Sequence, residues 1–368
     1  MLILTSVACL MAYAVELRES GQRQREFASN HECVIIYHHE LKDDPVTALP
    51  ESQIRDIYKG RLPTKHQWPG PAWIRSHLGD EAFASIAQAY LFSPRDEEVS
   101  TAKFECPGNL KLLHITGWFE LSKLEGLENL QQLETIRINC CGNLKDYSPL
   151  NELQQLRHAE LSRCDSMTEI PFKNLRNLEV LSISQAPRLA GYSELASLPG
   201  LKTLTLNRVG SLDFSSLGHN SISSLTIRMC SSSNASGFSK FQSLKNLTIL
   251  ACPIADVAEL GNLEKLETLT ITSSYSIEDF SPLGKLDNLK VLCLPRNPGL
   301  RDLEFAKNLS SLETLSVAEC NNLTNWDAVF SLKQLKLLDV TLCSKIKGQD
   351  VEELRKRLPN TEIKYYFQ

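Results

Sequence analysis

The chain has 368 residues, 42% hydrophobic and 23% charged, which is ordinary for a soluble folded protein. Its formal net charge of −5 argues against a nucleic-acid-binding protein, because such proteins usually carry a basic face. No block of like charges marks an acidic or basic tail.

The N-terminal segment from Leu2 to Val15 is apolar and uncharged. A membrane-spanning helix needs about 20 apolar residues and a signal-peptide core about 7–15. We expect residues 1–15 to form an anchor or signal-like segment that tethers the protein to a membrane. The alternatives are a cleaved signal with export, or a buried helix of a cytoplasmic protein. Arg18, Arg23 and Arg25 follow the segment and favour a cytoplasmic flank, so its orientation stays open.

Residues 16–105 are expected to form a small α/β lead-in and an N-terminal cap. The β-branched and aromatic run from Cys33 to Tyr37 predicts a strand. The apolar spacing from Pro71 to Ala84 predicts a helix. Ile86, Ala89 and Leu91 follow as a fragment of the repeat described below, in keeping with the atypical sequence of terminal repeats.

His38, His39 and Glu40 invite a metal-binding interpretation. On a strand, however, His38 and Glu40 face one way and His39 the other. A structural zinc site usually needs four ligands, and no second cluster with suitable spacing is present. We therefore expect no metal site.

A nine-residue phrase recurs over most of the chain, from Leu110 to Cys343. Its clearest copy is Leu133 to Cys141, L-x-x-I-x-I-x-x-C. Successive copies are 21–23 residues apart. They start at Leu110, Leu133, Leu156, Leu178, Leu201, Ile222, Leu244, Leu266, Leu289, Leu312 and Leu335. This is the strand signature of a leucine-rich repeat.

The repeat predicts an α/β fold, a leucine-rich repeat solenoid with about eleven repeats over residues 106–346. A curved parallel sheet forms its concave face, and short helical or 3-10 turns form its convex face. Positions 1, 4 and 6 of each phrase point into the core, and each buried side chain stabilises by roughly 1.5–3 kcal/mol. Positions 3, 5 and 7 point outward on the concave face.

The ninth position is expected to face inward at the turn after the strand, as a structural ladder. Seven ladder residues are Cys141, Cys164, Cys230, Cys252, Asn297, Cys320 and Cys343. Asn at this place bonds free backbone groups, and Cys is a small apolar substitute with a weak S–H donor. Neighbouring ladder cysteines stack roughly 4.8 Å apart, within disulfide reach, but we favour reduced, packed thiols.

On the convex side, Ser148-Pro149 and Ser281-Pro282 predict short helical turns with Ser as the N-cap and Pro at the first helical position. Residues 347–368 are expected to form a C-terminal cap. Its pattern predicts a helix from Gln349 to Leu358 and a last strand from Glu362 to Phe367.

Charged side chains gather on the concave face of the N-terminal third. The predicted partner-binding residues are His114, Arg137, His158, Glu160, Arg163, Arg208 and Arg228. Arginine is enriched at interface hot spots, which favours a protein-binding patch. The alternative is a solvated face with a cross-strand ion pair worth about 0.2–1 kcal/mol.

Neither this patch nor any motif predicts an enzyme. An acid–base role for His114 and Glu160 would need a pocket and a positioned nucleophile, which an open sheet does not offer. The phosphate-binding, zinc-protease and serine-hydrolase motifs are all missing from the sequence, so we expect no cofactor.

The S-P-L turn followed by L-x-x-L-x-x-L-x-L over residues 110–343 resembles the 22-residue, internalin-like class of bacterial leucine-rich repeat proteins. Residues 69–75 and 78–83 resemble the linker before the repeats in a group of bacterial proteins with an N-terminal membrane segment. This resemblance implies a membrane-tethered repeat protein of unassigned function. The apolar segment departs from that pattern because it is short and no charge precedes it. The ladder cysteines also resemble plant immune-receptor repeats, but no nucleotide-binding domain is present.

These observations favour a non-catalytic protein-interaction module that is membrane-tethered and binds a protein, and not a nucleic acid, on its concave face. The alternative is a cytoplasmic substrate adaptor or effector whose activity lies in residues 16–105. A purely structural surface protein is the third hypothesis. The sequence leaves the partner, the oligomeric state and the side of the membrane open.

Overall fold

The computed structural model describes residues 110–366, except 211, 213–214, 216–220 and 232–235, together with the strands Cys33–Tyr37 and Ile86–Phe92. The apolar segment 1–15, the expected helix at 71–84 and the cluster His38-His39-Glu40 lie outside these residues. The chain divides into two compact units. One runs to Met167 and includes Pro171–Leu178, and the other comprises Thr168–Ile170 and the chain from Glu179 onward.

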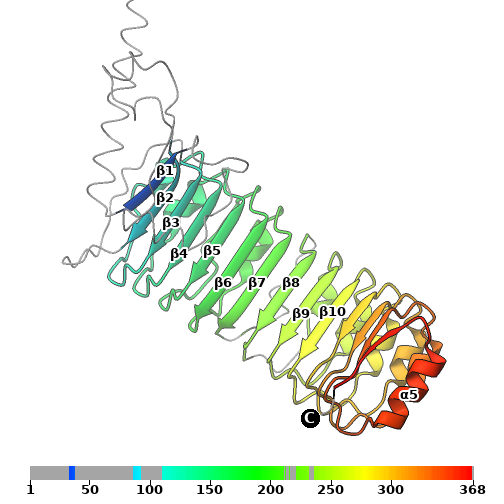
Figure 1. Ribbon diagram of the computed structural model, residues 1–368. Helices are drawn as coiled ribbons and strands as arrows, with labels where there is room; N and C mark the ends of the chain where they lie inside the picture. Colours follow the sequence, from blue (N-terminus) through cyan, green and yellow to red (C-terminus); the bar gives the residue numbers. More distant parts are fainter. Residues whose placement is uncertain are drawn as a thin grey trace, which may run out of the picture. The chain divides into compact units, whose positions relative to one another are not determined.

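The first unit is built on a sheet whose first strand runs against the others. Its strands are β1 (Cys33–Tyr37), β2 (Ile86–Phe92), β3 (Leu112–Thr116), β4 (Thr135–Asn139) and β5 (His158–Ser162). The pair β1–β2 is antiparallel, and β2 to β5 are parallel neighbours in sequence order (Figure 1). The strands predicted at Cys33–Tyr37 and around Ile86 are therefore confirmed.

The second unit contains nine parallel strands that follow one another in sequence order. They are β6 (Val180–Ala186), β7 (Thr203–Val209), β8 (Ser224–Arg228), β9 (Asn246–Leu250), β10 (Thr268–Thr272), β11 (Val291–Cys293), β12 (Thr314–Ser316), β13 (Leu337–Asp339) and β14 (Glu362–Lys364). Equivalent repeat positions pair across neighbouring strands, as with Thr248 and Thr270. Register therefore follows repeat position.

Short 3-10 turns connect the strands. They are η3 (Leu127–Asn129) and η4 (Ser148–Glu152) in the first unit, and η5 (Ser193–Ser197), η6 (Phe238–Lys240), η7 (Ala258–Asn262), η8 (Ser281–Lys285), η9 (Glu304–Asn308) and η10 (Asp327–Ser331) in the second. The helix α5 (Gly348–Arg357) precedes β14, so the helix and the last strand predicted near the C-terminus are present, and the strand is shorter than predicted. In the second unit the 3-10 turns lie behind the sheet, and α5 lies at the C-terminal end of the unit (Figure 1).

The core lies between the sheet and the turns. Its inward columns are positions 1, 4 and 6, as predicted, and Leu312, Leu315 and Val317 are all fully buried. One expectation is wrong at the first two repeats. Position 3 was expected to face solvent, yet Leu112 is fully buried and Thr135 is 5% exposed. Both lie beside the start of the sheet, where local alternation does not determine burial.

Each of the eleven repeats has one residue in the left-handed conformation at position 8 of the phrase, near the end of its strand or within three residues after it. The residues are Gly117, Cys140, Arg163, Gln185, Arg208, Met229, Ala251, Ser273, Arg296, Glu319 and Leu342, with φ between 50° and 77°. This bend turns the chain out of the sheet. A left-handed L-residue costs roughly 1–2 kcal/mol, and ten of the eleven repeats use a residue other than glycine here.

We predict that Ala251→Gly stabilises the fold. Ala251 is exposed with φ 51°, so glycine removes the left-handed strain at the cost of a more flexible unfolded chain. The net gain should be about 0.5–1 kcal/mol in the free energy of unfolding, measured by urea denaturation. The control Ala190→Gly, exposed and at negative φ, should destabilise. A loss of stability in Ala251→Gly would contradict the strain argument.

The turns are capped differently from the prediction. Ser148 and Ser281 were expected as N-caps, but each is the first residue of its turn, and the caps are Tyr147 and Phe280. The side chain that satisfies the free N–H group comes from two residues before the serine. Asp279 Oδ1 accepts a hydrogen bond from the Ser281 N–H at 2.8 Å, and Asp146 does the same for Ser148 at 3.0 Å.

The same device recurs in other repeats of the second unit. The aspartate or asparagine two residues ahead of η7, η9 and η10 accepts a bond from the first N–H of each turn at 2.7, 3.0 and 3.1 Å. In η10 the acceptor is Asn325. The hydroxyl and then the N–H of Ser281 hold the pKa of Asp279 below its ordinary value.

We predict that Asp279→Ala lowers stability by about 1 kcal/mol at neutral pH, the usual cost of losing a cap. Because the folded-state pKa is depressed, this contribution is present above the unfolded pKa and is lost as pH falls through the folded one. The variant should therefore approach the wild type in acid. Asp279→Asn, which copies Asn325, should keep the cap without that pH dependence. Urea unfolding at pH 7 and pH 3 tests both statements.

Candidate interaction surface

The ladder position holds successive repeats together by side-chain hydrogen bonds to backbone. Asn297, fully buried, donates through Nδ2 to the Ile271 carbonyl at 2.8 Å, and its Oδ1 accepts from the Ser274 N–H at 3.1 Å. Four of the six ladder cysteines donate to the equivalent carbonyl of the preceding repeat. Cys320 Sγ lies 3.0 Å from the Leu294 oxygen, and Cys343 Sγ lies 3.0 Å from that of Val317.

The ladder thiols in the first two occupied repeats point to the carbonyl two residues earlier. Cys141 donates to Asn139 and Cys164 to Ser162, each at 3.6 Å. Both are buried. Cys230 and Cys252 make both kinds of contact. The seven residues therefore occupy equivalent places, and we propose that they serve the structural role predicted for them.

A hydrogen bond with Cys252 lowers the pKa of Cys230 to about 7. Burial favours the protonated form of the other ladder thiols. It raises the pKa of Cys141 and Cys320 to about 12 and that of Cys164 and Cys343 to about 11. A hydrogen bond to Cys230, together with burial, raises the pKa of Cys252. All six cysteines are free, in agreement with the reduced, packed thiols favoured from the sequence.

The charged patch of the first unit is assembled as its register predicts. His114 pairs with Arg137, and Arg137 with Glu160, on β3, β4 and β5, and His158 lies opposite Thr135. Arg137 Nε is 3.3 Å from Glu160 Oε2, with side chains 37% and 53% exposed. The cross-strand ion pair weighed as the alternative is therefore present.

The remaining predicted partner residues lie at the ends of strands. Arg163 donates to Cys140 Sγ at 3.6 Å, in the first unit. In the second unit, Arg208 Nε lies 3.2 Å from Met229 Sδ, and Arg228 ends β8 with an exposed side chain. Arg163 and Arg208 occupy the left-handed position, so their side chains start from the edge of the sheet.

The outward face of the second unit's sheet carries few charges. At positions 3, 5 and 7 from β6 to β13, only Arg228 and Asp339 are charged. The fifth-position column is Ser182, Thr205, Thr226, Thr248, Thr270, Cys293, Ser316 and Asp339, all partly exposed. We call the outward positions 3, 5 and 7 of β6 to β13 the hydroxyl strip.

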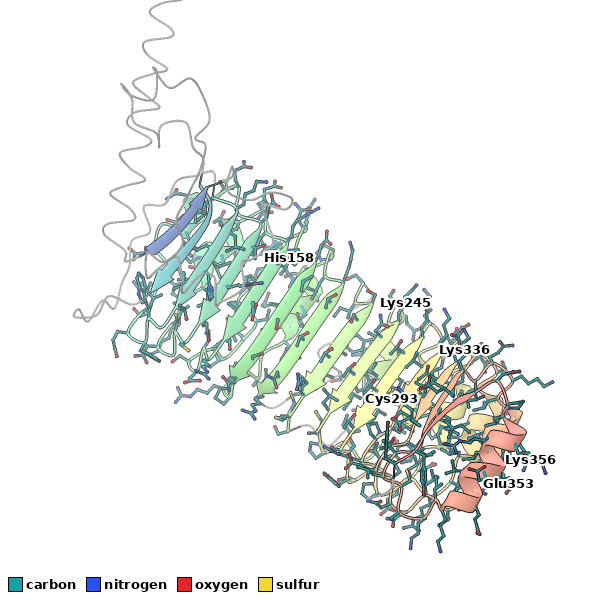
Figure 2. The ribbon with its side chains drawn as sticks, in the orientation of Figure 1. His158, Lys245, Cys293, Lys336, Glu353 and Lys356 are labelled. Carbon is teal, nitrogen blue, oxygen red and sulfur yellow. The ribbon has the colours of Figure 1, made fainter. Side chains whose placement is uncertain are left out.

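A column of alternating charges borders the hydroxyl strip where the strands begin. Glu267 pairs with Lys245 at 3.2 Å and with Lys290 at 2.8 Å, and Glu313 pairs with Lys336 at 2.8 Å. Figure 2 shows Lys245 and Lys336 along this margin. The hydrogen bond from Lys290 and then that from Lys245 lower the pKa of Glu267. Each of these solvent-exposed pairs contributes little to stability.

The opposite margin, where strands end, exposes large apolar groups. In the second unit Met229 is 48%, Tyr275 71% and Tyr366 69% exposed, and each follows a strand by no more than three residues. Arg296 and Glu319 lie on the same margin and form an ion pair at 2.8 Å. Met, Tyr and Arg are the residue types enriched in protein interfaces.

In the described part of the chain, no three His, Cys, Asp or Glu side chains are grouped so that they could hold a metal ion. No helix within the same residues has the length and apolar character needed to cross a membrane.

Comparison with known proteins identifies the fold of the chain but assigns it to no family. No protein-family model matches the chain, and no curated protein matches it. Among solved structures, an internalin (inlF) of Listeria monocytogenes is 18% identical with a TM-score of 0.51, and the match covers 80% of this chain and 93% of that one. The fold is a leucine-rich repeat solenoid. The likeness supports the fold alone, since the identity is low.

Two other leucine-rich repeat structures match less well and carry no argument. Internalin C2 of Listeria monocytogenes is 24% identical over 54% of this chain and 76% of its own, with a TM-score of 0.39. A leucine-rich repeat protein of Leptospira interrogans is 17% identical over 70% and 90%, with a TM-score of 0.38.

Sequence reasoning missed both margins of the hydroxyl strip. The alternating column was visible at position 2, where Lys245, Glu267, Lys290, Glu313 and Lys336 follow one another at repeat spacing. The apolar groups gave a weaker signal, because Met229 and Tyr275 occupy different repeat positions. Both become visible when the repeats are aligned and their columns are compared.

We predict that Asn297→Ala destabilises the protein by about 2–4 kcal/mol, since it leaves the buried Ser274 N–H and Ile271 carbonyl without their partner. Asn297→Cys, which copies the ladder residue of the next repeat, should lose less because its thiol restores one donor. Urea unfolding of the two variants measures the difference. Equal losses would show that the side-chain hydrogen bond contributes nothing.

Proposed function

We propose that this leucine-rich repeat protein is a protein-interaction module whose partner covers the hydroxyl strip and its two margins. The observation that carries the proposal is the distribution of charge. The centre of the second unit's sheet is nearly uncharged, and paired charges lie along its border. Protein interfaces have this anatomy, with charge depleted at the centre and polar groups at the rim.

The seven residues predicted from the sequence have a peripheral role in this proposal. Arg137 and Glu160 already neutralise each other, so a partner would gain little from either charge. Arg228 is a member of the hydroxyl strip at the end of β8, and Arg208 lies near the end of β7; both can contact a partner at the rim. His114, His158 and Arg163 belong to a second contact area in the first unit.

The same charge distribution describes the partner. A face that packs on hydroxyls and methyl groups should itself be polar but weakly charged at its centre, because an unpaired charge there would be desolvated. Binding should accordingly depend weakly on ionic strength, in contrast to complexes held by complementary charged patches.

The finer parts of the sequence prediction are also proposals. They are a tether formed by residues 1–15, a lead-in at 16–105, repeats at 106–346 and a cap at 347–368, with the protein held at a membrane by the first of these. A carbonate-washed membrane fraction that retains the native protein with residues 1–15 intact would support the tether. Recovery of the whole protein in the soluble fraction would refute it.

We predict that the double variant Thr226→Glu, Thr270→Glu abolishes partner capture. Two negative charges at the centre of the hydroxyl strip would be desolvated on binding, and capture from a lysate of the native cell should fall at least about tenfold, measured by quantitative mass spectrometry. The matched control Asn262→Glu, Ser310→Glu places the same charges on exposed turn residues and should capture normally. Equal capture by both double variants would refute the proposal.

A further inference from the structure

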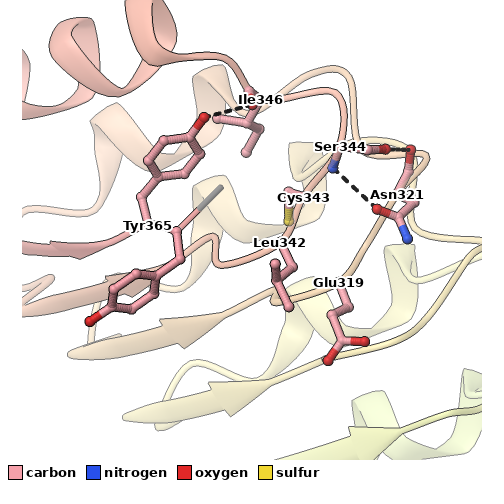
Figure 3. Close-up of a pocket in the computed structure, with 8 residues that line it drawn as sticks. Glu319, Asn321, Leu342, Cys343, Ser344, Ile346 and Tyr365 are labelled. Carbon is pink, nitrogen blue, oxygen red and sulfur yellow. Dashed lines mark hydrogen bonds between the residues drawn. The ribbon is translucent and has the colours of Figure 1, made fainter. Parts of the chain in front are cut away.

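A pocket of about 460 Å³ opens where the last three strands of the second unit end. Eight residues line it, namely Glu319, Asn321, Leu342, Cys343, Ser344, Ile346, Tyr365 and Tyr366. Figure 3 shows side chains from the loops after β12 and β13 facing Tyr365, which follows β14. The pocket adjoins the hydroxyl strip, because Leu342 directly follows Thr341 at its edge.

Hydrogen bonds between the lining residues fix the walls. The Tyr365 hydroxyl donates to the Ile346 carbonyl at 3.3 Å. The Ser344 N–H donates to Asn321 Oδ1 at 3.1 Å, and its hydroxyl donates to the Asn321 carbonyl at 3.3 Å (Figure 3). These bonds tie the cap to the last two repeats, so the pocket is formed before a ligand arrives.

The pocket has one acidic side chain in its wall. Glu319 is the one charged residue among the eight that line it. One of its oxygens, Oε1, receives Arg296 from outside the pocket, and a carboxylate can accept further hydrogen bonds. Burial raises the pKa of Cys343 to about 11, and the charges of Asp339 and Glu319 act in the same direction.

The remaining lining is aromatic and aliphatic. Tyr366 is 69% exposed and presents most of its ring to the solvent, and Leu342 and Ile346 supply apolar wall. A carboxylate beside an aromatic ring suits a guanidinium, whose planar fork pairs with the first and stacks on the second. An acidic side chain would be repelled by Glu319, and an apolar one would cover that carboxylate without offering it a further hydrogen bond.

We propose that this pocket holds an arginine side chain of the protein partner, with its stem against Leu342 and Ile346 and its guanidinium between Glu319 and Tyr366. This rests on the proposed function and adds a specific anchor to it. A single buried arginine in a preformed pocket is the kind of contact that dominates interface energies.

The test is a titration of the full chain with acetyl-arginine amide, followed through the ¹³C-labelled methyl groups of Leu342 and Ile346. Both signals should shift, and acetyl-norleucine amide should shift them far less. Glu319→Gln should weaken arginine binding by about tenfold, the usual effect of losing a charged acceptor. Arg296→Gln should strengthen it several-fold, because it releases the carboxylate from its present partner. The control Glu264→Gln, an exposed carboxylate elsewhere, should change nothing.

The two substitutions have opposite signs, which a merely structural role could not produce. Equal binding of norleucine amide, no shift at either methyl group, or weaker binding in both variants would overturn the proposal. The titration needs no partner, so its outcome is independent of the capture experiment. A chain that binds arginine amide yet captures the same partners with glutamates at 226 and 270 would retain the pocket and lose the concave-face function.

Discussion

The structure depends on the fact that no single repeat can bury its own leucine face. Each repeat offers three inward side chains on a strand too short to be stable alone, so the face is covered only when the next repeat stacks on it. The ladder at position 9 makes that stacking specific. A buried donor from one repeat reaches a backbone carbonyl of the repeat before it, as Asn297 does with Ile271. Equivalent positions then pair between neighbouring strands, so every column on the outer face follows the repeat.

Cysteine fills most of the described ladder because it meets both requirements of the site. It is small and apolar enough to be buried, and its S–H group still reaches the carbonyl that asparagine would reach. Its weaker hydrogen bond is offset by the lower cost of burying it. The same burial raises the pKa of Cys141 and Cys320, which makes these two thiols unreactive.

Most of the fold could be predicted from the sequence because the same pattern occurs in every repeat and predicts the same geometry each time. The strand at Cys33–Tyr37 was also found, since β-branched side chains mark it locally. The predictions fail where a contact outside the local sequence pattern determines the capping or the burial of a residue. Serine is a typical N-cap residue, but the N–H of Ser281 donates to the carboxylate of Asp279. Leu112 alternates like an outward residue, yet it is buried. Local periodicity predicts neither the partner of the Ser281 N–H nor the burial of Leu112.

The candidate site was less predictable because it is defined by columns and edges. The patch at His114, Arg137 and Glu160 stood out since charges are conspicuous in a sequence, and its register was correct. The hydroxyl strip is distinguished by its lack of charged residues, and this lack becomes visible only when the repeats are aligned. The pocket needs the cap to bring Tyr365 against Ile346, nineteen residues earlier, and no sequence pattern announces that contact.

The central claim is that a protein partner covers the hydroxyl strip. It is tested most directly by photo-cross-linking in the native cell, with a benzophenone amino acid at Thr248 in the middle of the strip. The same probe at Asn262 on the exposed turn side serves as the comparison. We expect a discrete adduct with one protein from position 248 and none from position 262. An adduct from position 262 alone, or no adduct at 248, would contradict the proposed function.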